Sequence, residues 1–145
     1  MKTTKLKVLF LCTGNSCRSQ MAEAIVNARY GDNWEAFSAG TQPAGYIHPN
    51  ALAVLKEIGI EHHGTSKGIN EFRGIDFDLV VTVCDDAAEN CPVWVGKAAQ
   101  RNHWSFEDPA AFKGTDEERM GKFCEVRDLI EQKITAWIEE QKCKK

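Results

Sequence analysis

The sequence predicts an α/β protein with a four-stranded parallel sheet flanked by helices on both faces. Short apolar runs typical of buried strands alternate with helical patterns along the chain, which favours a parallel sheet. A length of 145 residues is typical of one domain with a substantial core. Because no repeat, low-complexity segment or long linker divides the chain, residues 1–145 are expected to form that single domain.

The first half of the chain contains two expected strands and two expected helices. Lys7–Cys12 reads as a buried strand, Ser19–Arg29 as a helix and Glu35–Ala39 as a short strand. Pro49 suits the first turn of a helix that runs through Ile58, where Gly59 follows as the expected end. The residues expected on the inner face of the first helix are Met21, Ala24, Ile25 and Ala28.

The second half contains two further strands and a long closing helix. Asp78–Cys84 is almost wholly β-branched or apolar, and Arg101–Ser105 is the expected last strand. The closing helix is expected from Thr115 to Gln141, with Thr115 and Glu118 as a capping box. Its expected buried stripe is Phe123, Ile130, Ile134 and Trp137.

Composition excludes several classes of function. A net charge of −3 without a basic stripe gives no reason to expect nucleic-acid binding. No apolar run has the length of a membrane span, and none resembles a signal peptide, so we expect a cytoplasmic protein that does not bind membranes. Six cysteines then indicate redox or metal chemistry, but no C-x2-C pair exists for zinc, and no metal site is predicted.

The segment from Cys12 to Ser19 has the composition of an anion-binding loop. It joins an expected strand to an expected helix, so its backbone N–H groups can converge on a tetrahedral anion at the positive end of the helix dipole. Arg18 adds two forked donors, and these positive surroundings favour the nucleophilic thiolate of Cys12. The simpler reading makes Cys12 a core residue that ends a strand. The expected substrate-binding residues are Thr13, Gly14, Asn15, Ser16, Cys17, Arg18 and Ser19.

Two further reactive residues are expected near this loop. Ligands of parallel α/β sheets bind at the carboxyl ends of the strands, where Cys12 and Cys84 lie and where Asp108 follows the last strand. Asp108 precedes Pro109, which fixes the backbone beside the carboxyl group and makes Asp108 a candidate general acid. Taken alone, an Asp-Pro pair more commonly marks a turn.

Cys84 and Cys91 form an unusual pair. Seven residues of regular helix would separate them by about 10 Å along the axis, whereas a disulfide needs Cα atoms within about 7 Å. They could therefore bond only if the segment between them looped or unwound. The spacing alone equally allows two unrelated cysteines.

These motifs resemble those of the thioredoxin-coupled arsenate reductases, which share the fold of low-molecular-weight protein tyrosine phosphatases. The resemblance spans nearly the whole chain. The loop alone fits either group of enzymes, and the two downstream cysteines favour the reductases. The matching segments are Cys12–Glu23, Ser38–Gly40, Val80–Cys84 with Cys91-Pro92, and His103-Trp104 with Asp108-Pro109.

The resemblance implies arsenate reduction by a relay of three cysteines. Cys12 would attack arsenate, with Arg18 holding the oxyanion and Asp108 protonating the departing oxygen. Cys84 would then attack Cys12 and release arsenite. Cys91 would attack Cys84 in turn, and thioredoxin would reduce the resulting Cys84–Cys91 disulfide.

One position departs from the resemblance. Relatives that bind potassium beside the loop use residues matching Asn15, Glu23 and Thr65, together with an aspartate where this chain has Lys67. An ammonium group cannot ligate a cation, so no cofactor is predicted. Lys67 could take the place of the cation and neutralise Glu23, or it could be a solvated surface residue.

Three other functions fit parts of the pattern. A low-molecular-weight tyrosine phosphatase would need the nucleophile, the arginine and the acid, but neither downstream cysteine. A non-catalytic oxyanion binder would need neither a thiolate nor an acid. A redox sensor that only forms the Cys84–Cys91 disulfide would leave the anion-binding loop unexplained.

Overall fold

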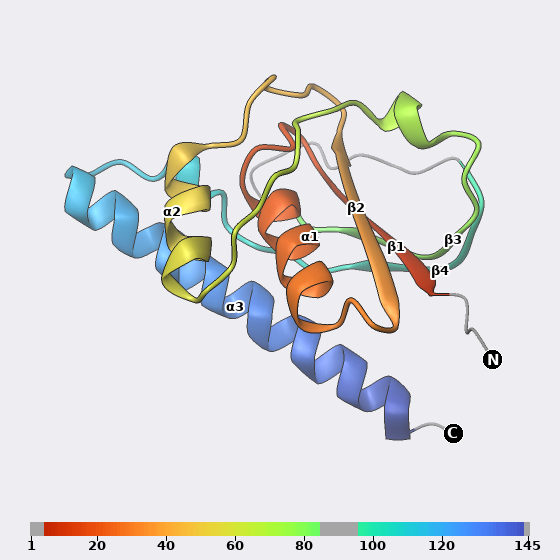
Figure 1. Ribbon diagram of the computed structural model, residues 1–145. Helices are drawn as coiled ribbons and strands as arrows, with labels where there is room; N and C mark the ends of the chain where they lie inside the picture. Colours follow the sequence, from red (N-terminus) through yellow and green to blue (C-terminus); the bar gives the residue numbers. More distant parts are fainter. Residues whose placement is uncertain (1–4, 85–95, 144–145) are drawn as a thin grey trace.

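The computed structural model describes residues 5–84 and 96–143 of the chain. Its sheet has four parallel strands, as the sequence predicts, and their order is β2-β1-β3-β4 (Figure 1). In this order the first strand is central, so each of its neighbours is reached by a crossover connection. The strands are β1 (Leu6–Cys12), β2 (Trp34–Gly40), β3 (Phe77–Thr82) and β4 (Ala98–His103).

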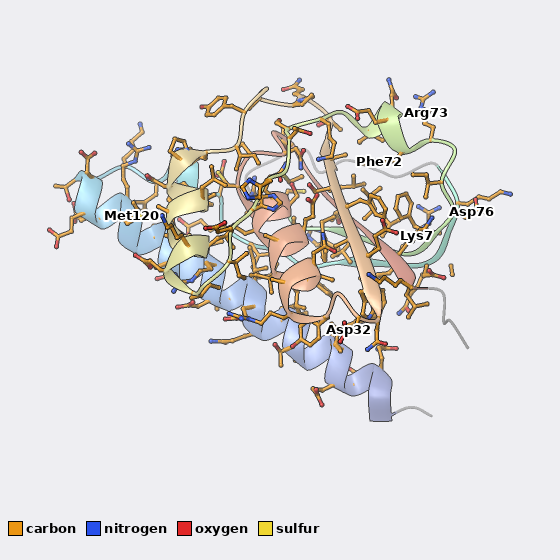
Figure 2. All side chains as sticks on the ribbon, in the orientation of Figure 1. Lys7, Asp32, Phe72, Arg73, Asp76 and Met120 are labelled. Atoms are coloured by element: carbon orange, nitrogen blue, oxygen red, sulfur yellow. The ribbon has the colours of Figure 1, made fainter. Side chains whose placement is uncertain are left out.

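Three α-helices pack together on one face of the sheet (Figure 1). They are α1 (Arg18–Arg29), α2 (Pro49–Glu57) and α3 (Asp116–Cys143). Two short 3-10 helices complete the described elements, η1 (Ile69–Phe72) and η2 (Pro109–Ala111). Phe72 of η1, labelled in Figure 2, packs with Leu9, Leu11 and Val80 in a second apolar cluster, so the described sheet carries helical residues on both faces.

Two strands end earlier than the apolar pattern predicts. β3 stops at Thr82 instead of Cys84, and β4 ends at His103 instead of Ser105. β4 also begins at Ala98, three residues before the expected start. The reason is that β4 is an edge strand with mostly exposed residues, so its sequence lacks the apolar pattern of a buried strand.

The ends of α2 follow local sequence signals. In α2, Pro49 is the first residue, and Nδ1 of His48 accepts a hydrogen bond from the backbone N–H of Asn50. Gly59 follows the helix with φ +81, a left-handed conformation that favours glycine.

In α1, Ala28 is exposed, although the sequence analysis expected it on the inner face of the helix. The buried residues of this helix also include Ala22 and Val26, because α1 contacts both the sheet and the other helices.

The closing helix begins with the expected capping box. The Glu118 N–H donates to Thr115 Oγ1 (3.1 Å), and the Thr115 N–H donates to Glu118 Oε1 (2.9 Å). Phe123, Ile130 and Ile134 are buried as expected, whereas Trp137 is half-buried beside the buried Ile138. Met120 lies on α3 near α2 (Figure 2). No helix among the described residues has the length and apolarity to span a membrane.

Strand register places the functional residues at one edge of the sheet. Leu11 of β1 pairs with Thr82 of β3, and the Val83 N–H donates to the Leu11 carbonyl (2.9 Å). Continuing this register places Val83 beside Cys12, with Cys84 one residue further. The carboxyl ends of β1 and β3 therefore bring the two cysteine-bearing segments together.

Candidate active site

A buried loop joins β1 to α1 at the carboxyl edge of the sheet. Cys12 is the last residue of β1 and only 2% exposed, and Arg18 is the first residue of α1 and only 3% exposed. The loop lies close to the end of β2, where a Cβ at Gly40 would be 2.4 Å from the Thr13 carbonyl oxygen. Only glycine allows this approach, which explains the glycine that ends β2.

The loop carbonyls point outward, toward a flanking segment. Backbone N–H groups of residues 42–48 bind three of these carbonyls: Gln42 to Thr13 (2.9 Å), Ala44 to Gly14 (2.9 Å) and His48 to Ser16 (3.0 Å). In a trans peptide, the N–H of the next residue points opposite to the carbonyl. The N–H groups of Gly14, Asn15 and Cys17 therefore point away from the flanking segment, as an anion-binding loop requires.

The sulfur of Cys12 receives directed hydrogen bonds from this loop. The Asn15 N–H donates to Cys12 Sγ (3.3 Å), and Ser19 Oγ lies 2.8 Å from the same sulfur. Because Ser19 Oγ already accepts a hydrogen bond from Asn15 Nδ2 (2.8 Å), its own hydrogen is available to Cys12. Two donors aimed at one sulfur stabilise the thiolate, the nucleophilic form.

Two hydrogen bonds to Oδ1 fix the orientation of the Asn15 side chain. Its Oδ1 accepts hydrogen bonds from Gln20 Nε2 and from the Lys67 N–H, both at 2.9 Å, which turns Nδ2 toward Ser19. Asn15 has φ +49, a left-handed backbone conformation that asparagine tolerates. The fully buried side chain of Gln20 also donates to the Thr65 carbonyl (2.8 Å) and thus ties the loop to a distant segment.

Sequence reasoning assigned no role to Gln20 or to its partner His62. The Nε2 of His62 lies 2.7 Å from Gln20 Oε1, and since that oxygen can only accept, the histidine donates. Polar residues at these positions carry no local pattern that reveals the contact, because 42 residues separate them. The available signal was the polar Gln20 beside the apolar Met21 in the expected helix.

Arg18 and Asp108 meet as the sequence predicts. Arg18 Nη2 lies 3.8 Å from Asp108 Oδ2, and Arg18 Nη1 donates to the Phe106 carbonyl (3.1 Å). Asp108 precedes η2, where its Oδ1 accepts a hydrogen bond from the Ala110 N–H (3.0 Å). Pro109 and this bond hold the partly exposed carboxyl group toward the guanidinium at the mouth of the loop.

Cys17 is a second thiol in the loop, with different chemistry. Burial raises the pKa of Cys17 to about 12, although a hydrogen bond from Ser16 opposes the shift. Cys17 therefore stays a protonated thiol at neutral pH, which is a poor nucleophile.

Of the two downstream cysteines, the structure describes Cys84. Cys84 is fully buried and follows β3 in the register described above. The structure holds Cys84 in a disulfide-bonded form, while Cys12, Cys17 and Cys124 carry free thiols. Cys91 lies outside the described residues, so its expected role and the expected opening of the segment between the two cysteines remain predictions.

The residues matching a potassium site also meet beneath the loop, with Lys67 among them. Lys67 Nζ donates to the Thr65 carbonyl (2.5 Å) and lies 3.9 Å from Glu23 Oε1. The ammonium group therefore donates to the Thr65 carbonyl and lies within ion-pair distance of the Glu23 carboxyl group. Among the described residues, no three His, Cys, Asp or Glu side chains form a metal-binding group.

Replacing Ser19 tests the hydrogen-bond network around the sulfur. Ser19→Ala removes the hydroxyl donor, and a hydrogen bond to a charged group contributes about 1.5–3 kcal/mol. We expect alkylation of reduced Cys12 by iodoacetamide at pH 7 to slow about tenfold. Mass spectrometry of the peptide from residues 8–18 measures the rate, because its fragments distinguish Cys12 from Cys17. The exposed Ser105 provides the matched control, Ser105→Ala. Equal rates in both variants would contradict this role for Ser19.

Comparisons with known proteins agree with this geometry. An arsenate reductase of Halalkalibacterium halodurans is 46% identical over 136 residues, covering 93% of this chain and 96% of that protein. A solved arsenate reductase in the phosphate binding state superposes with a TM-score of 0.73 at 29% identity, covering 93% of this chain and 98% of the other. A thioredoxin-dependent arsenate reductase of Corynebacterium glutamicum gives 0.62 at 26% identity, covering 94% of this chain and 63% of that one.

The comparison with protein families covers almost the whole chain. Residues 7–145 match the family described as low molecular weight phosphotyrosine protein phosphatase. The match includes the loop from Cys12 to Arg18, all four strands of the sheet and Asp108. The chain therefore belongs to the low molecular weight phosphotyrosine protein phosphatase family.

Proposed function

We propose that this protein is an arsenate reductase that draws its reducing equivalents from thioredoxin. The observation that carries the proposal is the Cys12 sulfur at the end of β1, which receives the Asn15 N–H and the Ser19 hydroxyl while Arg18 begins the next helix. This arrangement suits a thiolate that attacks a tetrahedral oxyanion. The related arsenate reductases support arsenate as that anion.

The first step forms a covalent bond to arsenic. The Cys12 thiolate attacks As(V), a sulfur–arsenic bond forms and one arsenic–oxygen bond breaks. Asp108 gives its proton to the departing oxygen, which leaves as water, while Arg18 and the loop N–H groups from Thr13 to Ser19 bind the remaining oxygens. The fixed position of Asp108 near Arg18 supports this assignment.

The second step transfers two electrons to arsenic. A Cys84 thiolate attacks the Cys12 sulfur, so that a Cys12–Cys84 disulfide forms and the sulfur–arsenic bond breaks. The electron pair of that bond stays on arsenic, which leaves as arsenite, As(III). Cys91 then attacks Cys84 and frees the Cys12 thiol, and thioredoxin reduces the Cys84–Cys91 disulfide.

The position of Cys84 favours reduction over phosphate ester hydrolysis. Hydrolysis needs a water molecule after the first step and no second thiol. Here the register of β1 and β3 brings a buried cysteine next to the end of the strand that carries the nucleophile. The disulfide-bonded form of Cys84 further supports redox chemistry at this residue.

The proposed partners and location follow from the same chemistry. Thioredoxin as the reductant is supported by the structural similarity to a thioredoxin-dependent arsenate reductase. Because a cysteine relay needs a reducing compartment to be regenerated, we place the protein in the cytoplasm, where it would contribute to arsenical resistance.

An assay of two activities on one sample tests the proposal. Arsenate reduction is followed as NADPH consumption with thioredoxin and thioredoxin reductase, and phosphatase activity with p-nitrophenyl phosphate. We expect arsenate-dependent NADPH consumption that needs thioredoxin and produces arsenite. Hydrolysis of the ester without any arsenate reduction would instead support the phosphatase alternative.

A further inference from the structure

A mostly half-buried polar cluster lies next to the anion-binding loop, outside the proposed relay. We call it the sub-loop cluster. The carboxyl group of Glu23 is at its centre, with Oε1 accepting from Ser38 Oγ (2.6 Å) and lying 3.9 Å from Lys67 Nζ. Its other oxygen lies 3.8 Å from His62 Nε2. The members of the sub-loop cluster are Glu23, Ser38, His62, Thr65 and Lys67.

Lys67 supplies the positive charge that faces the Glu23 carboxyl group. The Glu23 side chain is only 12% exposed, and burial raises the pKa of Glu23, while the Ser38 hydrogen bond and the charge of Lys67 oppose that shift. Burial and the Lys67 charge lower the pKa of His62, so this imidazole is neutral at pH 7. The charge that faces Glu23 in the sub-loop cluster is therefore the ammonium of Lys67.

Lys67 is half-buried, and its ammonium lies beside two oxygens of the protein. The side chain is only 15% exposed, and Nζ lies between the Thr65 carbonyl and the Glu23 carboxyl group. Long lysine side chains normally keep the ammonium in water. Here the Lys67 side chain turns back toward the Thr65 carbonyl, two residues earlier in the sequence. Its charge therefore lies near that oxygen and the Glu23 carboxyl group.

The sub-loop cluster is connected to Cys12 through the side chains of Asn15 and Ser19. The Lys67 N–H donates to Asn15 Oδ1, and Asn15 Nδ2 donates to Ser19, which in turn contacts Cys12. The Thr65 carbonyl that binds Lys67 Nζ also accepts from Gln20 Nε2, the second donor to Asn15. Moving residues 65–67 would therefore release both hydrogen bonds that orient the Asn15 amide.

We propose that Lys67 is a positioning residue whose ammonium acts as a tethered cation, holding the loop around Cys12 without an exchangeable metal ion. The ammonium neutralises Glu23 and binds the Thr65 carbonyl, the two tasks of a monovalent cation at this place. A second cation would meet a site already filled and a charge that repels it. The chain is therefore insensitive to potassium.

Three variants test the tethered cation. Lys67→Met removes the charge, Lys67→Asp replaces it with a carboxylate that can ligate a cation, and Lys56→Met, at an exposed lysine, is the matched control. Melting temperatures are measured in potassium chloride and in choline chloride at equal ionic strength. We expect no difference between the salts for the natural chain. Lys67→Met should melt roughly 5 °C below Lys56→Met in both salts, because it leaves a buried carboxyl group without its partner.

Lys67→Asp provides the sharpest result. In choline chloride two neighbouring carboxyl groups destabilise this variant, and potassium should raise its melting temperature by about 4 °C. Potassium should also restore the rate at which iodoacetamide alkylates reduced Cys12, which we expect to be about threefold slower in Lys67→Met and in Lys67→Asp without potassium. A lysine that only packs against its neighbours would not show this rescue.

The proposal fails on any of three results. These are potassium-specific stabilisation of the natural chain, a Lys67→Met variant that melts and reacts like Lys56→Met, and a folded Lys67→Asp variant without a potassium effect. If Lys67→Asp does not fold, the natural chain and Lys67→Met still decide the matter through the first two results. None of these measurements uses arsenate, so the proposed arsenate reduction can fail while the tethered cation stands.

Discussion

A Cys12→Ser variant is expected to lose arsenate reduction by at least about a thousandfold. In the proposed mechanism the reaction begins with attack by the Cys12 sulfur, which lies within hydrogen-bond distance of the Asn15 N–H and the Ser19 hydroxyl. A serine alcohol at this place is not ionised at neutral pH, and no histidine contact is present among the described residues to remove its proton. The measurement is the thioredoxin-coupled assay, with the phosphatase assay on the same preparation.

A control variant must distinguish a loss of catalytic activity from a loss of folding. Cys124→Ser is a matched substitution on α3, where the half-buried thiol contacts Glu57 and lies outside the loop. This variant should keep both activities, and both variants should melt close to the natural protein. Arsenate turnover by a folded Cys12→Ser protein would show that another group performs the attack. Cys17 could not explain such a result, because burial keeps its thiol protonated.

The sequence predicts the buried part of the fold better than its edge. β1 follows directly from an apolar run, since a central parallel strand is covered on both faces. β4 was placed three residues too late, because an exposed edge strand such as Ala98–His103 needs no apolar residues. Ala28 was placed on the inner face of α1 because a single apolar stripe was assumed, whereas α1 is buried by both the sheet and other helices.

The residues proposed to perform the chemistry have a clearer sequence signal than the residues that hold them in place. Cys12 and Arg18 lie in one short segment between a strand and a helix, so their spacing identifies them. Gln20 and His62 act through contacts that span 42 residues and depend on the tertiary fold. The role of Lys67 needed the structure as well, because its sequence position fitted either a solvated lysine or a substitute for a cation.

Replacing Cys84 should separate the attack on arsenate from its reduction. In Cys84→Ser, Cys12 can still form the sulfur–arsenic bond, but no thiol is present to displace arsenic from Cys12. We expect arsenate-dependent turnover with thioredoxin to fall by at least about a thousandfold. Any phosphatase activity should stay within about twofold of the natural protein, since hydrolysis uses only the loop and Asp108.

The burial of Cys84 determines which variants make this test decisive. The residue is fully buried, so a serine hydroxyl at this position adds a polar group that needs a hydrogen-bond partner. Cys84→Ala removes the thiol without adding a hydroxyl, and the two variants should show the same loss of arsenate reduction. Cys124→Ser again serves as the matched control. If both Cys84 variants lose the two activities in equal measure, Cys84 has a structural role in the packing beside Cys12 and takes no part in electron transfer. The anion-binding loop would then serve ester hydrolysis, which needs the thiolate, Arg18 and Asp108 alone.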